Sequence, residues 1–157
     1  MCPAPPNRPT AAPRGTPDRR GGSSAPAPES APLFDPTKSL AELVDSLAER
    51  QADQFPRGEL RSAQLRRFFG EAKYLYRQLE SGTDYKTAIE PQFKMLRSKA
   101  SYAYRNGQSG GKIPEVFHDF LDRGVQKVTD EESFRKFILH FEAVVGFLYG
   151  KGMVSND

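Results

Sequence analysis

The stretch QLRRFFGEAKYLYRQLE, residues 64–80, combines two patterns in one predicted helix. Its apolar residues recur at spacings of three and four, which predicts an α-helix packed on a hydrophobic core. These residues are Leu65, Phe68, Phe69, Ala72, Leu75, Tyr76 and Leu79. At about 100° per residue, a second set falls in one narrow strip on the other side, formed by Arg66, Gly70, Lys73 and Arg77. Packing explains the apolar face, but the aligned cations with a glycine between them need a separate explanation.

The helical period continues on both sides of this stretch, and no segment alternates with a period of two over a useful length. We therefore predict an all-α fold, a compact bundle of about five helices within residues 37–152. The expected helices cover about 39–50, 62–81, 89–106 with a start or kink at Pro91, 114–128 and 129–150. Helix starts are expected at Ser39, Ser62, Pro114 and Thr129, and Gly150 closes the last helix.

Residues 1–36 have a different composition from the rest of the chain. They contain ten of the 13 prolines and almost no large apolar residue before Leu33. Such a segment buries too little apolar surface to offset the entropy lost on ordering, so we predict a disordered tail. Residues 153–157 are expected to form a short C-terminal tail.

Positive charge is concentrated in the middle of the chain. From Arg57 to Arg105 there are 11 Lys or Arg residues and five Asp or Glu residues, although the net charge is only +3. This asymmetry favours an anionic partner at one face. The predicted helix over 89–106 repeats the first strip, with Lys94, Ser98, Ser101 and Arg105 aligned and Arg97 beside them. Phosphate binding and an ordinary solvated helix face remain about equally supported by these residues alone.

The sequence does not contain a recognisable set of catalytic or metal-binding residues. Cys2 is the only cysteine and there are two histidines, so we expect no Ser-His-Asp or Cys-His nucleophile and no thiolate metal site. Glu115, His118 and Asp122 share a helix face, but a di-iron bundle needs a second such motif. No run of residues is long and apolar enough to span a membrane. We expect a binding protein with no cofactor, no metal and no enzyme activity.

The last predicted helix is apolar over more than half of its circumference. Either it is the central element of the bundle, or part of it meets another protein chain. The sequence leaves both interpretations open.

Several segments resemble the small subunit of the type III-A CRISPR–Cas effector, the Csm complex. They are QLRRFF followed by Lys73, then FKMLRSKASYAYR, then FILHFEAVVGFLYGKG, and the resemblance covers about residues 60–152. It implies an all-α, non-catalytic subunit present in several copies along the inner side of the complex. It also implies contacts with the backbone and large subunits and with the phosphates of the guide and target RNA. The family's basic positions fall on Arg66, Arg67, Lys73, Lys94, Arg97, Lys99 and Arg105, of which Lys99 lies about 140° away from the strip.

The resemblance and the strips together predict an RNA-binding subunit of an antiviral ribonucleoprotein in the prokaryotic cytoplasm. Gly70, Arg77 and Ser101 join the family's basic positions as expected RNA contacts, and further copies of the chain are expected partners. The alternative is a purely structural assembly subunit, in which the helical surfaces dock other proteins.

Overall fold

The computed structural model describes residues 2–4, 31–106 and 112–156. The rest of the predicted N-terminal tail and the segment 107–111 lie outside the described residues. Helices account for nearly all of the regular structure, in agreement with the predicted all-α fold. The elements in chain order are α1 (Leu40–Val44), α2 (Ser46–Asp53), β1 (Leu60–Arg61), α3 (Ser62–Glu80), η1 (Tyr85–Ile89), α4 (Glu90–Asn106), α5 (Glu115–Lys127), α6 (Glu131–Gly150) and β2 (Val154–Ser155).

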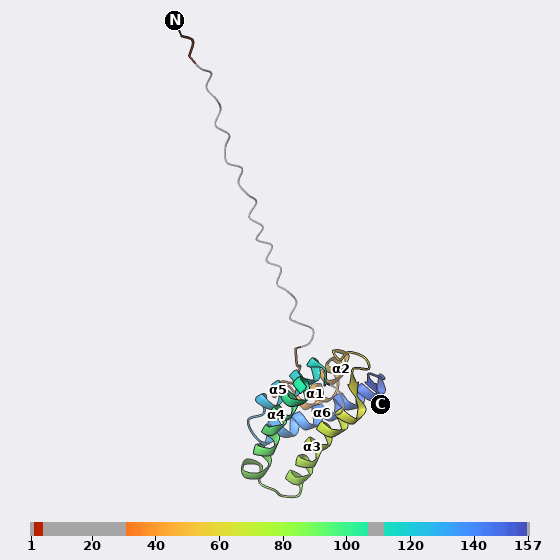
Figure 1. Cartoon of the computed structure of the whole chain (residues 1–157). Coiled ribbons are helices and arrows are strands. Elements are labelled where there is room, and N and C mark those ends of the chain that lie inside the picture. Colours follow the sequence, from red (N-terminus) through yellow and green to blue (C-terminus); the bar gives the residue numbers. More distant parts are fainter. Residues whose placement is uncertain (1, 5–30, 107–111, 157) are drawn as a thin grey trace.

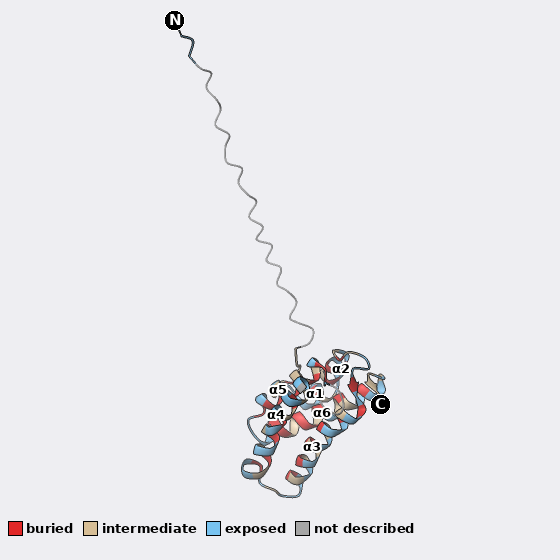
Figure 2. Ribbon diagram, viewed as in Figure 1, coloured by how far each residue is buried: buried red, intermediate tan, exposed pale blue. Residues whose placement is uncertain are grey.

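Helix α6 is the central element of the bundle, which decides between the two interpretations of its apolar surface. It packs against α1, α2, α3 and α5, and Figure 1 shows it running through the middle of the bundle. Its buried side chains include Phe134, Phe137, Phe141 and Val144. Figure 2 shows the general arrangement, with buried residues on the inward sides of the helices and exposed residues outside.

The predicted first helix is two helices, because the chain breaks at Asp45. The Leu43 carbonyl accepts a hydrogen bond of 2.6 Å from Nδ1–H of His140 on α6. This hydrogen bond gives the Leu43 carbonyl a partner outside α1, just before the chain breaks at Asp45. His140 is fully buried, and burial lowers the pKa of its imidazole, so the ring stays neutral.

The ordered core begins earlier than the predicted tail allows. Phe34 is fully buried and lies edge-on to Phe137 at a centroid distance of 5.2 Å. Its carbonyl accepts a hydrogen bond from Lys127, and the Leu33 N–H donates to the Gln51 side chain. The boundary at residue 36 was therefore wrong, because one large aromatic ring contributes enough buried surface to hold the segment that precedes α1.

The C-terminal residues 153–156 are also part of the fold. Val154 pairs with Leu60 in a short parallel ladder between β1 and β2. The Gly58 N–H donates to the Met153 carbonyl at 2.8 Å, and Arg57 donates to the Lys151 carbonyl. These bonds place the predicted C-terminal tail against the segment that enters α3.

The predicted helix ends are mostly accurate, with shifts of one residue at three starts. Pro114, expected in the first turn of α5, lies at its N-cap position instead. Ser39 caps α1 as expected, but α3 is preceded by Arg61 rather than Ser62. Helix α6 starts after Asp130, whose side chain accepts from the Ser133 N–H, rather than after Thr129. The irregularity expected at Pro91 is the π-helix η1, which ends just before it. Proline lacks the N–H that would bond the carbonyl of residue 87, which accounts for an irregular turn at this place.

Candidate nucleic-acid interface

Two helices carry all of the residues expected to bind RNA. Helix α3 carries Arg66, Arg67, Gly70, Lys73 and Arg77, and helix α4 carries Lys94, Arg97, Lys99, Ser101 and Arg105. Each of these residues is exposed or only partly buried, so none belongs to the hydrophobic core. All of them therefore lie at the surface. Whether each cation can contact a ligand depends on the carboxylates and carbonyls next to it.

Helix α3 presents three arginines to solvent. Arg66, Arg67 and Arg77 are exposed, and within residues 31–106 and 112–156 no carboxylate lies within ion-pair distance of them. Arg66 and Arg77 are 11 residues apart, about 16 Å along the helix axis and on the same side. Gly70 lies between them, and a Cβ added there would meet open space. A polyanion can approach the backbone at this point.

Lys73 completes the α3 strip but is not free. Its ammonium pairs with Glu142 of α6 at 2.8 Å and lies 5.1 Å from the centre of the Tyr76 ring. The Glu142 side chain is about half exposed, at 48%. Exposed pairs of this kind contribute about 0–1 kcal/mol, so a phosphate can compete for the ammonium.

On α4 the corresponding cations are held by neighbouring helices. Arg97 pairs with Asp122 of α5 at 2.9 Å, and Lys99 pairs with Glu71 of α3. Both pairs are at the surface, and each neutralises a charge that the sequence analysis expected to face RNA.

Lys94 has a structural contact. Its ammonium donates to the carbonyls of Val125 at 2.9 Å and Val128 at 2.6 Å, where α5 ends. The Val125 carbonyl also accepts the N–H of the C-cap residue Val128 at 3.3 Å. A cation at this end of the helix interacts favourably with the helix dipole. Burial lowers the pKa of Lys94, opposed in part by Glu90. The residue caps a helix rather than presenting its charge.

The two strips do not form one double row, contrary to the matching arrangement expected from the sequence. Glu71 and Lys99, which join α3 to α4, each lie about 140° around their helix from the strip. Both strips therefore point away from this contact, and neither faces the other helix. The α3 strip borders α6 through Glu142, and the α4 strip borders α5 through Asp122.

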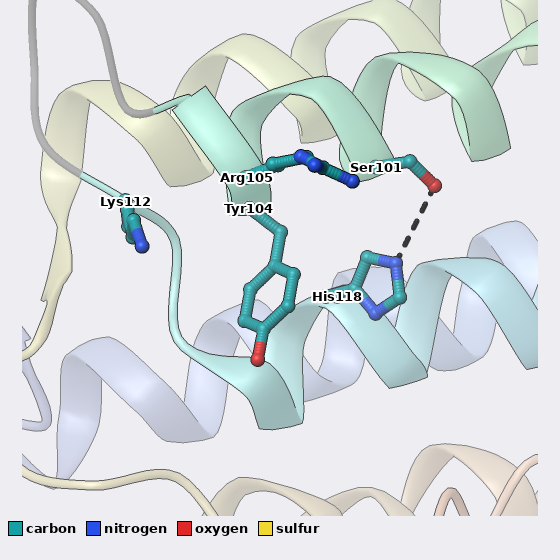
Figure 3. Close-up of a pocket in the computed structure, with 5 residues that line it drawn as sticks. All are labelled: Ser101, Tyr104, Arg105, Lys112 and His118. Atoms are coloured by element: carbon teal, nitrogen blue, oxygen red, sulfur yellow. Dashed lines mark hydrogen bonds between the residues drawn. The ribbon is translucent and has the colours of Figure 1, made fainter.

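A hollow of about 500 Å³ lies where the end of α4 faces the start of α5. It is lined by Ser101, Tyr104, Arg105, Lys112 and His118. Figure 3 shows Tyr104 between Lys112 and His118, with Arg105 extending along α4 toward Ser101. The Tyr104 and His118 rings are stacked, with centroids 4.9 Å apart and planes at 29°. Arg105 has no ion-pair partner in the part of the chain that the structure describes.

Ser101, His118 and Asp119 form a chain of polar contacts that the sequence analysis did not identify. Nε2 of His118 is 3.5 Å from the Ser101 hydroxyl, and Nδ1 is 3.1 Å from the Asp119 carboxylate. The three residues come from two helices packed side by side, so their spacing in the sequence did not indicate these contacts. The Ser101–His118 separation is at the outer limit of a hydrogen bond. These contacts hold the imidazole in one orientation beneath Tyr104.

Tyr104 and His118 are site residues that the sequence reasoning missed. Ser101 and Arg105 were found from their spacing, and Tyr104 precedes Arg105 directly. The partner residues Lys112 and His118 follow residues 107–111, so only the packing of α5 on α4 brings them to this place. The available signal was the high content of Tyr, Ser and Arg at the end of α4.

The described residues also bear on metal binding and on membrane insertion. Within residues 2–4, 31–106 and 112–156, no three His, Cys, Asp or Glu side chains lie together in a way that could hold a metal ion. None of the helices in the described part of the chain combines the length and apolar character that a membrane span requires.

A family of known proteins matches the chain. The family model described as Csm2 Type III-A matches residues 38–150. The match includes α1 and α2, which the resemblance seen in the sequence had left out. No curated protein matches the chain, and no solved structure does.

Proposed function

We propose, from the premise that the chain belongs to the Csm2 family of type III-A CRISPR small subunits, that it binds RNA without cutting it. In this proposal several copies lie along the guide and target RNA, beside the backbone and large subunits of the Csm complex. Each copy contacts the sugar-phosphate chain, and base pairing with the guide supplies the sequence specificity.

The observation that carries the proposal is the set of unpaired arginines on α3. Arg66, Arg67 and Arg77 are exposed and have no carboxylate nearby in the described residues. A guanidinium binds phosphate oxygens through two parallel N–H donors and keeps its charge at any physiological pH. The three guanidinium groups are therefore available to an anionic ligand.

The RNA contacts are therefore unequal. We assign the main contacts to Arg66, Arg67 and Arg77 on α3 and to Arg105 on α4, with Gly70 and Ser101 allowing close approach. Lys73, Arg97 and Lys99 contribute when a phosphate displaces their exposed carboxylate partners. Lys94 is left out, since its ammonium already bonds two carbonyls at the C-terminal end of α5, those of Val125 and Val128. A single copy then makes few contacts, and several copies on one strand sum through effective concentration.

Charge reversal tests this assignment on the purified chain. The triple variant R66E/R67E/R77E should bind a single-stranded RNA about tenfold or more weakly at roughly 100 mM salt. The slope of log affinity against log salt should fall by about 2, or roughly 0.7 for each lost phosphate contact. Fluorescence anisotropy at several salt concentrations measures both quantities.

The matched control reverses three cations on other surfaces. Lys38, Arg50 and Arg123 are exposed, and the variant K38E/R50E/R123E has the same net charge as the first. It should retain most of the affinity and the slope. Equal losses in both variants would mean that only overall charge matters, and the α3 assignment would be wrong.

A second function, a purely structural assembly subunit, is favoured by one feature. Tyr74 on α3 and Met95 and Tyr102 on α4 are more than half exposed. They lie on the helix sides that carry the Glu71–Lys99 pair, since they are three or four residues from its members. Exposed aromatic and Met side chains are typical of protein interfaces. If this function is correct, the α3 arginines face acidic protein surfaces, and the wild-type chain fails to bind RNA while R66E/R67E/R77E loses the other subunits.

A further inference from the structure

The hollow between α4 and α5 is separate from the α3 arginines and combines two kinds of group. It has two cations, Arg105 and Lys112, and an aromatic platform, Tyr104 on His118. We propose that it is a subsite for one nucleotide of a single-stranded RNA, with the phosphate held by the cations and the base stacked on Tyr104. This inference rests on the proposed RNA-binding function.

The charges around the hollow favour a phosphate. Arg105 and Lys112 are both exposed, and no acidic side chain is among the residues that line the hollow. Asp119 is close, but its carboxylate lies against Nδ1 of His118. Arg97, two turns earlier on the same helix, is neutralised by Asp122. The α4 strip therefore has an available guanidinium only at its C-terminal end, where Lys112 adds a second positive charge.

The ring pair favours a base rather than a bare anion. Tyr104 is stacked on His118 on one side and remains 38% exposed. His118 is in turn held by Ser101 and Asp119. The platform is therefore ordered before a ligand arrives, which lowers the entropy cost of binding. Single-stranded RNA is commonly bound by a basic groove with aromatic rings on which bases stack.

The hollow has a suitable size and position to hold one nucleotide of an RNA strand. Its volume of about 500 Å³ is in the range of small-molecule sites, and it is open to solvent on one side. A nucleotide can enter it while the strand continues over the surface. The Ser101 hydroxyl, at the inner side next to His118, can hydrogen-bond a phosphate or a ribose 2′-hydroxyl.

The first test replaces the platform. The variant Y104A should bind a 12-nucleotide single-stranded RNA about fivefold or more weakly, since stacking on one aromatic ring contributes that much in other proteins. The matched variant Y102A, on the same helix and outside the hollow, should lose less than about twofold. In wild-type protein, 4-thiouridine in the RNA should crosslink to Tyr104 or His118, located by mass spectrometry. Equal effects of the two variants, with crosslinks only on α3, would overturn the subsite.

The second test removes the charges, and both residues are exposed so that folding is preserved. The variant R105Q/K112Q should lower the salt slope by about 1.4, whereas K38Q/R123Q should leave it unchanged. Far-ultraviolet circular dichroism confirms that each variant is helical. If R66E/R67E/R77E weakens binding and R105Q/K112Q does not, the subsite is wrong and the proposed function stands. If the wild-type chain binds no RNA at any salt concentration, both proposals fail.

Discussion

Helices α3 and α4 have nearly the same pattern of surface residues, but their cations have different surroundings. On α3, Arg66 and Arg77 are exposed and have no carboxylate within reach in the described residues. On α4, Lys94 and Arg97 are held by α5. Two strips with the same spacing thus give one open basic surface and one strip in which two of the cations are held by the neighbouring helix.

The difference comes from the helix that borders each strip. The α4 strip meets the C-terminal part of α5, where the Val125 and Val128 carbonyls bond Lys94 and the Asp122 carboxylate pairs with Arg97. The α3 strip meets the middle of α6, where the backbone carbonyls are already bonded within the helix and Glu142 pairs with Lys73 alone. The neighbouring helix therefore provides partners for Lys94 and Arg97 on the α4 side, but only for Lys73 on the α3 side.

A large difference in the free energy of unfolding is expected between variants of Lys94 on α4 and of Lys73 on α3. K94M removes a partly buried cation from two carbonyls, and we expect the free energy of unfolding to fall by about 2 kcal/mol. K73M removes an exposed pair and should cost about 0.5 kcal/mol. Urea denaturation followed by circular dichroism measures both values. A cost for K94M no larger than that for K73M would remove the distinction between the strips.

A smaller effect is expected at the glycine of the α3 strip. G70A should raise the free energy of unfolding by about 0.5–1 kcal/mol, because alanine favours the helix and its Cβ meets open space. RNA affinity should fall about threefold if the strand approaches the backbone there. Thermal denaturation and anisotropy measure the two changes.

Gly124 of α5 provides the contrast for this variant. A Cβ there would collide with the ring of Phe137, so G124A should destabilise the fold by about 1–3 kcal/mol. If G70A also destabilised the fold, the surface at Gly70 would be more closely packed than the structure indicates. Unchanged RNA affinity in a stabilised G70A would place the strand away from this part of α3.

The smallest expected change in RNA affinity comes from freeing Lys73 of its carboxylate partner. E142Q removes the carboxylate that neutralises it, so RNA affinity should rise about threefold and the salt slope should increase by about 0.7. D122N, which releases Arg97 on the α4 side, serves as the matched variant. An equal gain in both would mean that the two strips contact RNA equally.

Most of the fold could be predicted from the sequence, because the apolar period of each long helix is a property of that helix alone. The end of α4 at Asn106 and of α6 at Gly150 followed from local residues. Phe34 was missed because one apolar residue in a proline-rich segment has no period to detect. The break at Asp45 was missed because the sequence does not show that His140, on a distant helix, bonds the Leu43 carbonyl beside it.

The sequence by itself determined the helices, the angle of each cation around its own axis and the resemblance to the family. Only the tertiary structure decided which cations are neutralised, which way the two strips turn, and that His118 lies under Tyr104. The physical reason is that spacing along a chain sets the direction of a side chain from its helix. What the side chain meets in that direction depends on the packing of the neighbouring helix, which the hydrophobic core fixes.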